Sequence, residues 1–188
     1  MRPRVTPEAS PRRGLAALGA VLATAALWVS LYHLNEWAFT HFEESRGANW
    51  IFLPAGLRLL AVLVWGWAGA LGLWVGTFVT ASMVFGCGSA AVWVAPPLSA
   101  LAPLIAVGLL RKPLGLRPDL QGLRAADLAQ LALASATLSA ALHSLAFVWV
   151  GAALANPADV ITMLVGDLVG TFVVLYALKL VLSALPAR

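Results

Sequence analysis

Long apolar runs alternate with short polar segments, or with segments rich in proline and glycine, along the whole chain. Six of these runs approach the ~20 residues of α-helix that cross the ~30 Å hydrocarbon core of a bilayer. We therefore predict an all-α fold: a polytopic membrane protein built as a six-helix transmembrane bundle. The predicted helices cover Gly14–Leu34, Trp50–Trp65, Trp67–Phe85, Ser89–Leu110, Ala126–Leu154 and Ala158–Leu185.

The composition supports this assignment. Hydrophobic residues make up 61% of the 188 residues and charged residues only 11%, whereas a soluble domain is about 45–50% apolar. We expect a multi-pass protein with the lipid bilayer as its surroundings and one domain, the bundle, over residues 14–185. A basic tail, residues 1–13, is expected to be mobile in the cytoplasm, and residues 186–188 form a short tail with no output domain attached.

The basic residues are segregated along the chain. If the bundle has six spans, ten of the twelve lie on one side of the membrane. They fall before the first helix, between the fourth and fifth helices, and at the C-terminal end. Since loops rich in Lys and Arg stay in the cytoplasm, we predict that both termini and the loop Arg111–Arg124 are cytoplasmic. Topology explains the basic groups, so we expect no nucleic-acid partner.

Prolines interrupt two of the predicted helices. Pro54 lies one turn inside the second helix, and Pro96 and Pro97 lie near the middle of the fourth. A proline inside a helix leaves a carbonyl without its donor, and such a carbonyl at membrane depth needs protein, water or a ligand. We expect an outer-half cavity lined by Pro54, Pro96, Pro97 and His143. A simple kink inside the bundle is the alternative.

Two pairs of glycines spaced four residues apart predict close helix packing. Gly72 and Gly76 form one ridge on the third helix, and we expect it to pack inside the bundle. Gly166 and Gly170 form the other ridge, on the last helix, and they flank Asp167. This spacing places the Asp167 carboxylate on a face where a neighbouring backbone comes close, so we expect it to face the interior and not the lipid.

Charged side chains at membrane depth are costly, at roughly 2.5–3.5 kcal/mol each on insertion scales. Arg58 and Asp167 both lie inside apolar runs, about eight to nine residues from the outer ends of their helices, so at ~1.5 Å per residue their depths agree. We predict that Arg58 and Asp167 form an ion pair. The alternative is that Arg58 reaches outward or binds freed carbonyls while Asp167 is protonated.

His143 lies one helical turn after Ser139 on a stripe of small residues, close in depth to the predicted pair. It is either a satisfied structural donor or a group that binds ligand or handles protons. These groups and the prolines form one candidate cluster, either ligand-binding or structural. We expect no metal and no cofactor, because no ligand pattern such as CxxC or HExxH occurs. The cluster residues are Arg58, His143, Asp167, Pro54, Pro96 and Pro97.

Three features resemble the MASE1 integral membrane sensor domains of bacterial signalling proteins. They are the segment WIFLPAG that opens a helix, the glycine-rich hairpin that follows, and a late G-D-x-x-G sequence. The positions that match are Pro54, Gly56, Asp167 and Gly170. The resemblance, over about residues 49–180, implies a bacterial inner-membrane protein whose bundle perceives an unidentified signal. Family members are usually longer and fused to a diguanylate cyclase, phosphodiesterase or histidine kinase, so we expect this chain to act through a separate partner protein.

Two other functions fit a compact basic six-helix protein. One is the substrate-binding subunit of a small-molecule transporter of the vitamin type, and the other is a structural subunit that binds no ligand. The architecture of a bundle does not decide between them. An enzyme is not expected, because the intramembrane Arg, His and Asp supply neither a nucleophile with its base nor a metal set.

Overall fold

The computed structural model describes residues 11–45, 48–151 and 157–184, and within these ranges the protein is almost entirely helical. Six α-helices confirm the predicted all-α class. Their bounds are α1 Pro11–Phe39, α2 Pro54–Trp65, α3 Trp67–Phe85, α4 Ala91–Leu110, α5 Ala125–Trp149 and α6 Pro157–Ala184. A 3-10 helix, η1 (Thr40–Phe42), and a small antiparallel hairpin, β1 (Glu43–Ser45) with β2 (Ala48–Asn49), connect α1 to the segment before α2.

Five of the described helices are long and apolar enough to cross a membrane, which indicates a multi-pass membrane protein. The exception is α2, which has 12 residues. The predicted tails fall mainly outside the described residues: residues 1–10 and 186–188 are not described. Arg12 and Arg13, which were expected in the N-terminal tail, belong to α1.

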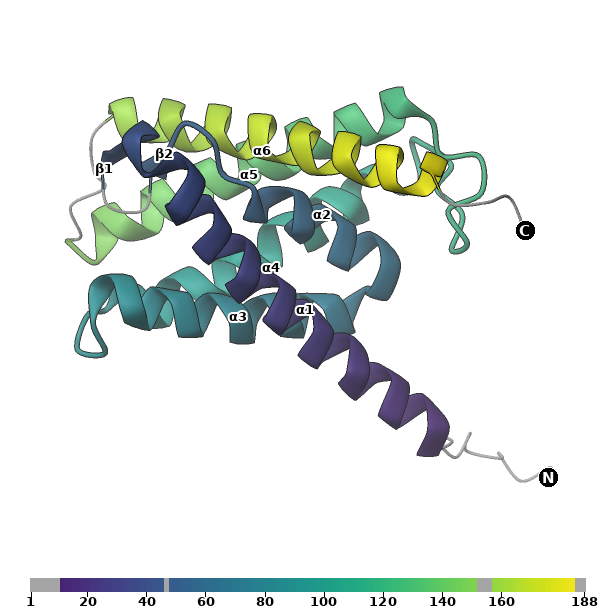
Figure 1. Ribbon diagram of the computed structural model, residues 1–188, viewed down its shortest axis with the longest axis horizontal. Coiled ribbons are helices and arrows are strands. Elements are labelled where there is room, and N and C mark those ends of the chain that lie inside the picture. Colours follow the sequence, from purple (N-terminus) through teal and green to yellow (C-terminus); the bar gives the residue numbers. More distant parts are fainter. Residues whose placement is uncertain (1–10, 46–47, 152–156, 185–188) are drawn as a thin grey trace, which may run out of the picture.

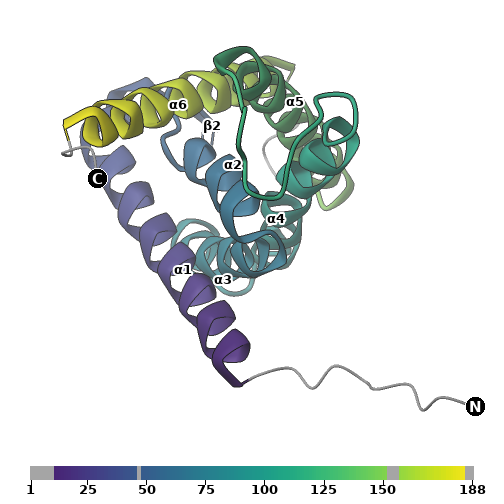
Figure 2. The same cartoon turned by 90° about the vertical axis from the view of Figure 1, so that its right-hand side faces the viewer.

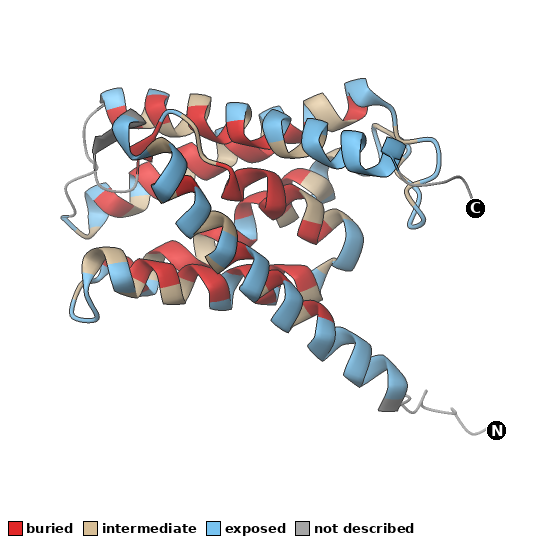
Figure 3. Ribbon diagram, viewed as in Figure 1, coloured by how far each residue is buried: buried red, intermediate tan, exposed pale blue. Residues whose placement is uncertain are grey.

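The short helix α2 lies at the centre of the bundle. The other five helices surround it in the order α1, α3, α4, α5, α6, each packed on the next, and α2 contacts all five. Figure 2 shows α2 enclosed by its neighbours, and Figure 3 shows its first half as buried. Residues Pro54 to Leu59 of α2 are all buried, although the segment includes Arg58. The interior of the bundle is therefore built around a helix that carries a charge.

The helices are arranged so that three parts of the chain share one end of the bundle. The first turn of α1, the last turn of α6 and the connection from α4 to α5 all lie toward the right of Figure 1. The β1–β2 hairpin and the connection between α3 and α4 lie at the opposite end. The segments that carry the basic groups are therefore at one end of the molecule.

The structure corrects the predicted start of the second helix. Helix α2 begins at Pro54 and not at Trp50, so Pro54 occupies the first helical turn. At that position the missing N–H would have had no helical acceptor, and the fixed φ suits the helix. The predicted bend at Pro54 is therefore wrong. Pro54 begins a helix instead.

The non-helical residues before α2 are held by protein groups. The Phe52 N–H donates to the Gly166 carbonyl at 3.1 Å, and the Leu53 N–H donates to Asn35 Oδ1 at 2.8 Å. Irregular backbone at membrane depth requires partners of this kind, since lipid offers none.

The prolines of α4 do not divide it. The helix runs without interruption from Ala91 to Leu110, although Pro96, Pro97 and Pro103 lie inside it. Pro96 and Pro103 are among the fully buried side chains, and α4 packs against both α3 and α5. The fourth helix is therefore not interrupted by its prolines, and it continues through them packed between α3 and α5.

The first glycine ridge packs inside the bundle, as predicted. A Cβ added to Gly72 would lie 2.5 Å from Thr24 Cβ, and one added to Gly76 would lie 2.8 Å from Trp28 Cβ, both in α1. Real side chains do not approach this closely, so only glycine allows α1 and α3 to lie at this separation.

Candidate functional site

The predicted ion pair between α2 and α6 is confirmed. Arg58 Nη1 and Nη2 donate to Asp167 Oδ2 and Oδ1, each at 3.0 Å, and each side chain is 6% exposed. Arg58 Nη1 also donates to the hydroxyl of Ser139 in α5. This bidentate geometry is the strongest form of an arginine–carboxylate ion pair. Three helices are joined at this point through side chains that lipid cannot reach.

The glycines around Asp167 explain how the pair can form. A Cβ at Gly166 would overlap the carbonyl of Asn49, and a Cβ at Gly170 would overlap the carbonyl of Phe52. The non-helical segment before α2 therefore lies directly on the glycine face of α6. Asp167 stands beside this contact, and Arg58 lies one turn into the helix that the segment leads into. The expectation of a close backbone beside Asp167 is thus confirmed.

Two aromatic rings cover the guanidinium. Arg58 Cζ lies 5.3 Å from the centre of the Phe52 ring and 5.7 Å from that of Trp28, distances at which a ring face attracts a cation. Trp28 is held in place because its Nε1 donates to Thr80 Oγ1 at 3.0 Å. Arg58 Nε, by contrast, is buried and has no hydrogen-bond partner among the described residues.

His143 lies next to the ion pair without touching either charge directly. Its Nδ1 lies 2.9 Å from the Ser139 carbonyl, which can only accept, so Nδ1 carries a hydrogen. Its Nε2 lies 3.4 Å from the hydroxyl of Ser99 in α4. Ser139 thus links the two parts of the cluster: its hydroxyl binds Arg58 and its carbonyl binds His143.

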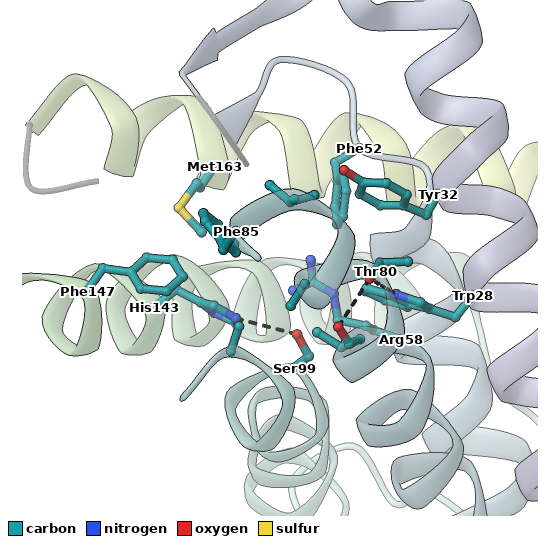
Figure 4. A pocket seen from close by; sticks show the side chains of 14 residues that line it. Trp28, Tyr32, Phe52, Arg58, Thr80, Phe85, Ser99, His143, Phe147 and Met163 are labelled. Carbon is teal, nitrogen blue, oxygen red and sulfur yellow. Dashed lines mark hydrogen bonds between the residues drawn. The ribbon is translucent and has the colours of Figure 1, made fainter. Parts of the chain in front are cut away.

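A cavity of about 90 Å³ lies between these groups. Figure 4 shows the side chains converging on it, with His143 and Ser99 facing one another. All six helices contribute to its wall. The lining residues are Trp28, Tyr32, Phe52, Arg58, Thr77, Thr80, Ala81, Val84, Phe85, Ala95, Ser99, His143, Phe147 and Met163.

The cavity exists, but its predicted lining is wrong for the three prolines. Of the four predicted residues only His143 lines it. Ala95 and Ser99 are four residues apart and share the face of α4 that meets the cavity. In a helix with 3.6 residues per turn, Pro96 and Pro97 are rotated from Ala95 by about 100° and 200°. Both prolines therefore lie on other faces of α4. Pro96 is fully buried, and Pro97 lines a separate surface groove beside Trp67.

Pro54 is likewise absent from the cavity wall. It is fully buried at the start of α2, one turn before Arg58, which does line the cavity. Its part is to set where α2 begins and hence how deep Arg58 lies.

Several site residues were not predicted. Thr77, Thr80 and Ser99 are small hydroxyl residues that also occur in ordinary packing faces, so nothing in the sequence singles them out. Trp28 is one of several tryptophans in the apolar runs, and nothing in the sequence distinguishes it from the others. Ser139 carried the one usable signal, its position one turn before His143.

Comparison with protein-family models, with curated proteins and with solved structures finds no match.

Proposed function

We propose that this chain is a sensory membrane module of the MASE1 type, which binds a small molecule in the cavity and acts through a separate partner protein. One observation carries the proposal: all six helices contribute side chains to a single cavity whose wall includes the buried cation Arg58. A ligand held there contacts every helix at once. Its binding energy therefore bears on how the helices pack, which is what a sensor needs.

The two segments on which the resemblance to MASE1 domains rests meet in the structure. The segment WIFLPAG and the sequence G-D-x-x-G are far apart in the chain, yet their backbones are hydrogen-bonded through Phe52 and Gly166. Arg58, two residues after the first segment, pairs with Asp167 of the second. The two segments, although distant in the sequence, thus form one local structure beside the cavity.

We also propose six membrane spans with both termini in the cytoplasm of a bacterium, in its inner membrane. The 12 residues of α2 rise roughly 18 Å at ~1.5 Å each, and the residues Trp50–Leu53 before it add at most roughly 13 Å. Together they match the ~30 Å hydrocarbon core. The basic segments that gather at one end of the bundle (Figure 1) fit the rule that such loops stay in the cytoplasm.

The cavity argues against the two alternative functions. A vitamin-type substrate needs a site in the range of about 300–1,000 Å³, and the cavity of about 90 Å³ is well below it. A purely structural subunit gains nothing from an unfilled cavity, since filling it with apolar side chains would be more stable.

Native purification followed by mass spectrometry tests the proposal. We expect wild-type protein to retain a small molecule, and Ala81→Leu, which fills the cavity wall, to lose it. Ala141→Leu on the exposed face of α5 is the matched control and should retain it. A kinase or cyclase without its own membrane region that co-purifies supports the sensory function. An ATPase with a transmembrane partner would instead support the transporter, and no retained molecule in any preparation would support the structural subunit.

A further inference from the structure

We infer that a groove at the end of the bundle where the basic segments gather binds an anionic phospholipid, with the phosphate at its mouth and an acyl chain along its length. The groove lies between the last two turns of α4, the junction of α2 and α3, and the connection from α4 to α5. Figure 2 is viewed from this end. We call it the α4 groove. It shares no wall residue with the central cavity, so the inference does not depend on the proposed function.

The α4 groove is lined by two arginines and by no carboxylate. Arg111 is exposed, and its side chain has no ion pair or hydrogen bond within the described part of the chain. Arg117 binds Asp119 at 3.1 Å, but these side chains are 62% and 44% exposed, so the pair is weak. Most N–H groups of both guanidiniums can therefore bind a further acceptor. Their forked donors match the oxygens of a phosphate.

The backbone of both arginines is fixed by the fold. The Leu116 N–H donates to the Arg111 carbonyl at 2.9 Å, and the Leu120 N–H donates to the Arg117 carbonyl at 3.0 Å. Leu116 also packs against the core cluster that contains Leu59. The connection from α4 to α5 is thus folded back onto the bundle, and the two guanidiniums extend from a wall that is already in place.

An apolar channel leads from the arginines into the membrane-spanning part of α4. Leu104, Val107, Gly108 and Arg111 lie on one face at helical spacing and all line the groove. Seven residues at ~1.5 Å each give it a length of about 10 Å along α4. A Cβ added to Gly108 would meet nothing within 4 Å, so this stretch is open. A soluble phosphate compound has no apolar part to fill such a channel, whereas a phospholipid has an acyl chain.

A tryptophan places the mouth of the groove at the level of lipid head groups. Trp67 lines the groove and is 72% exposed, and tryptophans favour the membrane–water interface. Basic pockets between helices at that level bind anionic head groups in other membrane proteins. Phosphatidylcholine and phosphatidylethanolamine carry an ammonium group for which the wall offers no carboxylate. A lipid with a net negative charge, such as phosphatidylglycerol, therefore fits better.

Native mass spectrometry of the full chain in detergent, titrated with lipids of equal chain length, tests the charge selection. Each arginine beside an anionic head group contributes roughly fivefold in affinity, so phosphatidylglycerol should bind roughly tenfold or more tightly than phosphatidylcholine. Arg111→Gln should weaken phosphatidylglycerol binding roughly fivefold and leave phosphatidylcholine binding unchanged. Arg13→Gln is the control, since Arg13 is exposed on α1 and does not line the groove. Equal affinity for the two lipids, or equal losses in the two variants, would overturn the inference.

A pair of glycine variants tests the acyl-chain channel. Gly108→Leu fills the channel, and Gly19→Leu on α1 is the matched control because it does not line the groove. An added Cβ meets nothing within 4 Å at either position, and leucine forms helix better than glycine, so both variants should fold. We expect Gly108→Leu to bind phosphatidylglycerol roughly tenfold or more weakly and Gly19→Leu to bind it like the wild type. Wild-type affinity in the Gly108→Leu variant would contradict the channel.

Two further outcomes would assign the α4 groove to another occupant and so refute the inference. The first is glycerol 3-phosphate binding as tightly as phosphatidylglycerol in both the wild type and Gly108→Leu, which would indicate a soluble phosphate compound. The second is a co-purified protein that is lost from Arg111→Gln and Gly108→Leu while phosphatidylglycerol binding is unchanged, which would indicate a protein partner.

Discussion

Arg58 and Asp167 are 109 residues apart in the chain, and their side chains are joined by two hydrogen bonds of equal length, 3.0 Å. Both groups are almost fully buried. Neither helix could hold its charged residue at this depth alone at small cost, because lipid offers no counter-charge and no water. The pair is therefore a requirement of the fold, and its arginine is also part of the cavity wall.

We expect removal of either partner to be costly. Arg58→Ala or Asp167→Ala leaves the other charge buried and should lower the free energy of unfolding by about 3–5 kcal/mol, while the exchange Arg58→Asp with Asp167→Arg should be less damaging than either single change. Unfolding in mixed detergent measures this. The exposed pair Arg117–Asp119 is the control, and Arg117→Ala should cost no more than about 1 kcal/mol. A double exchange no better than the single variants would contradict the role of the pair.

The glycine face of α6 provides a second prediction. Gly166→Ala and Gly170→Ala each place a Cβ against backbone of the segment before α2, and backbone cannot yield as a side chain can. We expect each to lower the free energy of unfolding by about 1–3 kcal/mol or more.

Gly108→Ala in α4 is the matched control, since an added Cβ there meets nothing within 4 Å. It should be neutral or stabilising by up to ~1 kcal/mol. Equal effects of the changes on α4 and α6 would show that helix propensity, and not the close approach, governs these positions.

A third prediction concerns the support of the non-helical segment by α1. Asn35 is fully buried, and its Oδ1 accepts the Leu53 N–H. Asn35→Leu leaves that N–H without an acceptor and should cost about 1–3 kcal/mol. It should also speed hydrogen exchange at the Leu53 amide. Trp37→Leu, at a side chain that is 82% exposed on the same helix, should leave exchange at Leu53 unchanged.

The single cysteine tests the proposed topology. Cys87 is exposed in the connection between α3 and α4, which the proposal places outside the cytoplasm. A maleimide that cannot cross the inner membrane should therefore label Cys87 in intact cells. In a Cys87→Ser, Arg117→Cys protein it should label only after the membrane is opened. The reverse pattern would invert the topology.

The sequence predicted the pair because ionisable residues are so rare in its apolar runs. With one arginine and one aspartate at matching depth, few other partners exist. The packing of Gly72, Gly76 and the glycines beside Asp167 was predictable for a similar reason, since small residues four positions apart in membrane helices favour close approach.

The wall of the cavity was not predictable to the same extent. Which residues of α4 face inward depends on the rotation of that helix about its axis, and the apolar run from Ala91 to Leu110 has hydrophobic side chains all round. The role of Pro54 was missed because a proline after an apolar run fits a kink as well as a helix start. Only the contacts of Phe52 and Leu53 with other elements decide between the two.

The long separation between Arg58 and Asp167 also affects biosynthesis. At about 5–20 residues per second, a ribosome needs roughly 5–20 s to add the 109 residues between them. In that interval α2 is a short apolar helix with an uncompensated charge and without the α6 face that its leading segment binds. We therefore expect α2 to reach its final depth only after α6 has been made, which would make the central helix of the bundle among the last to insert.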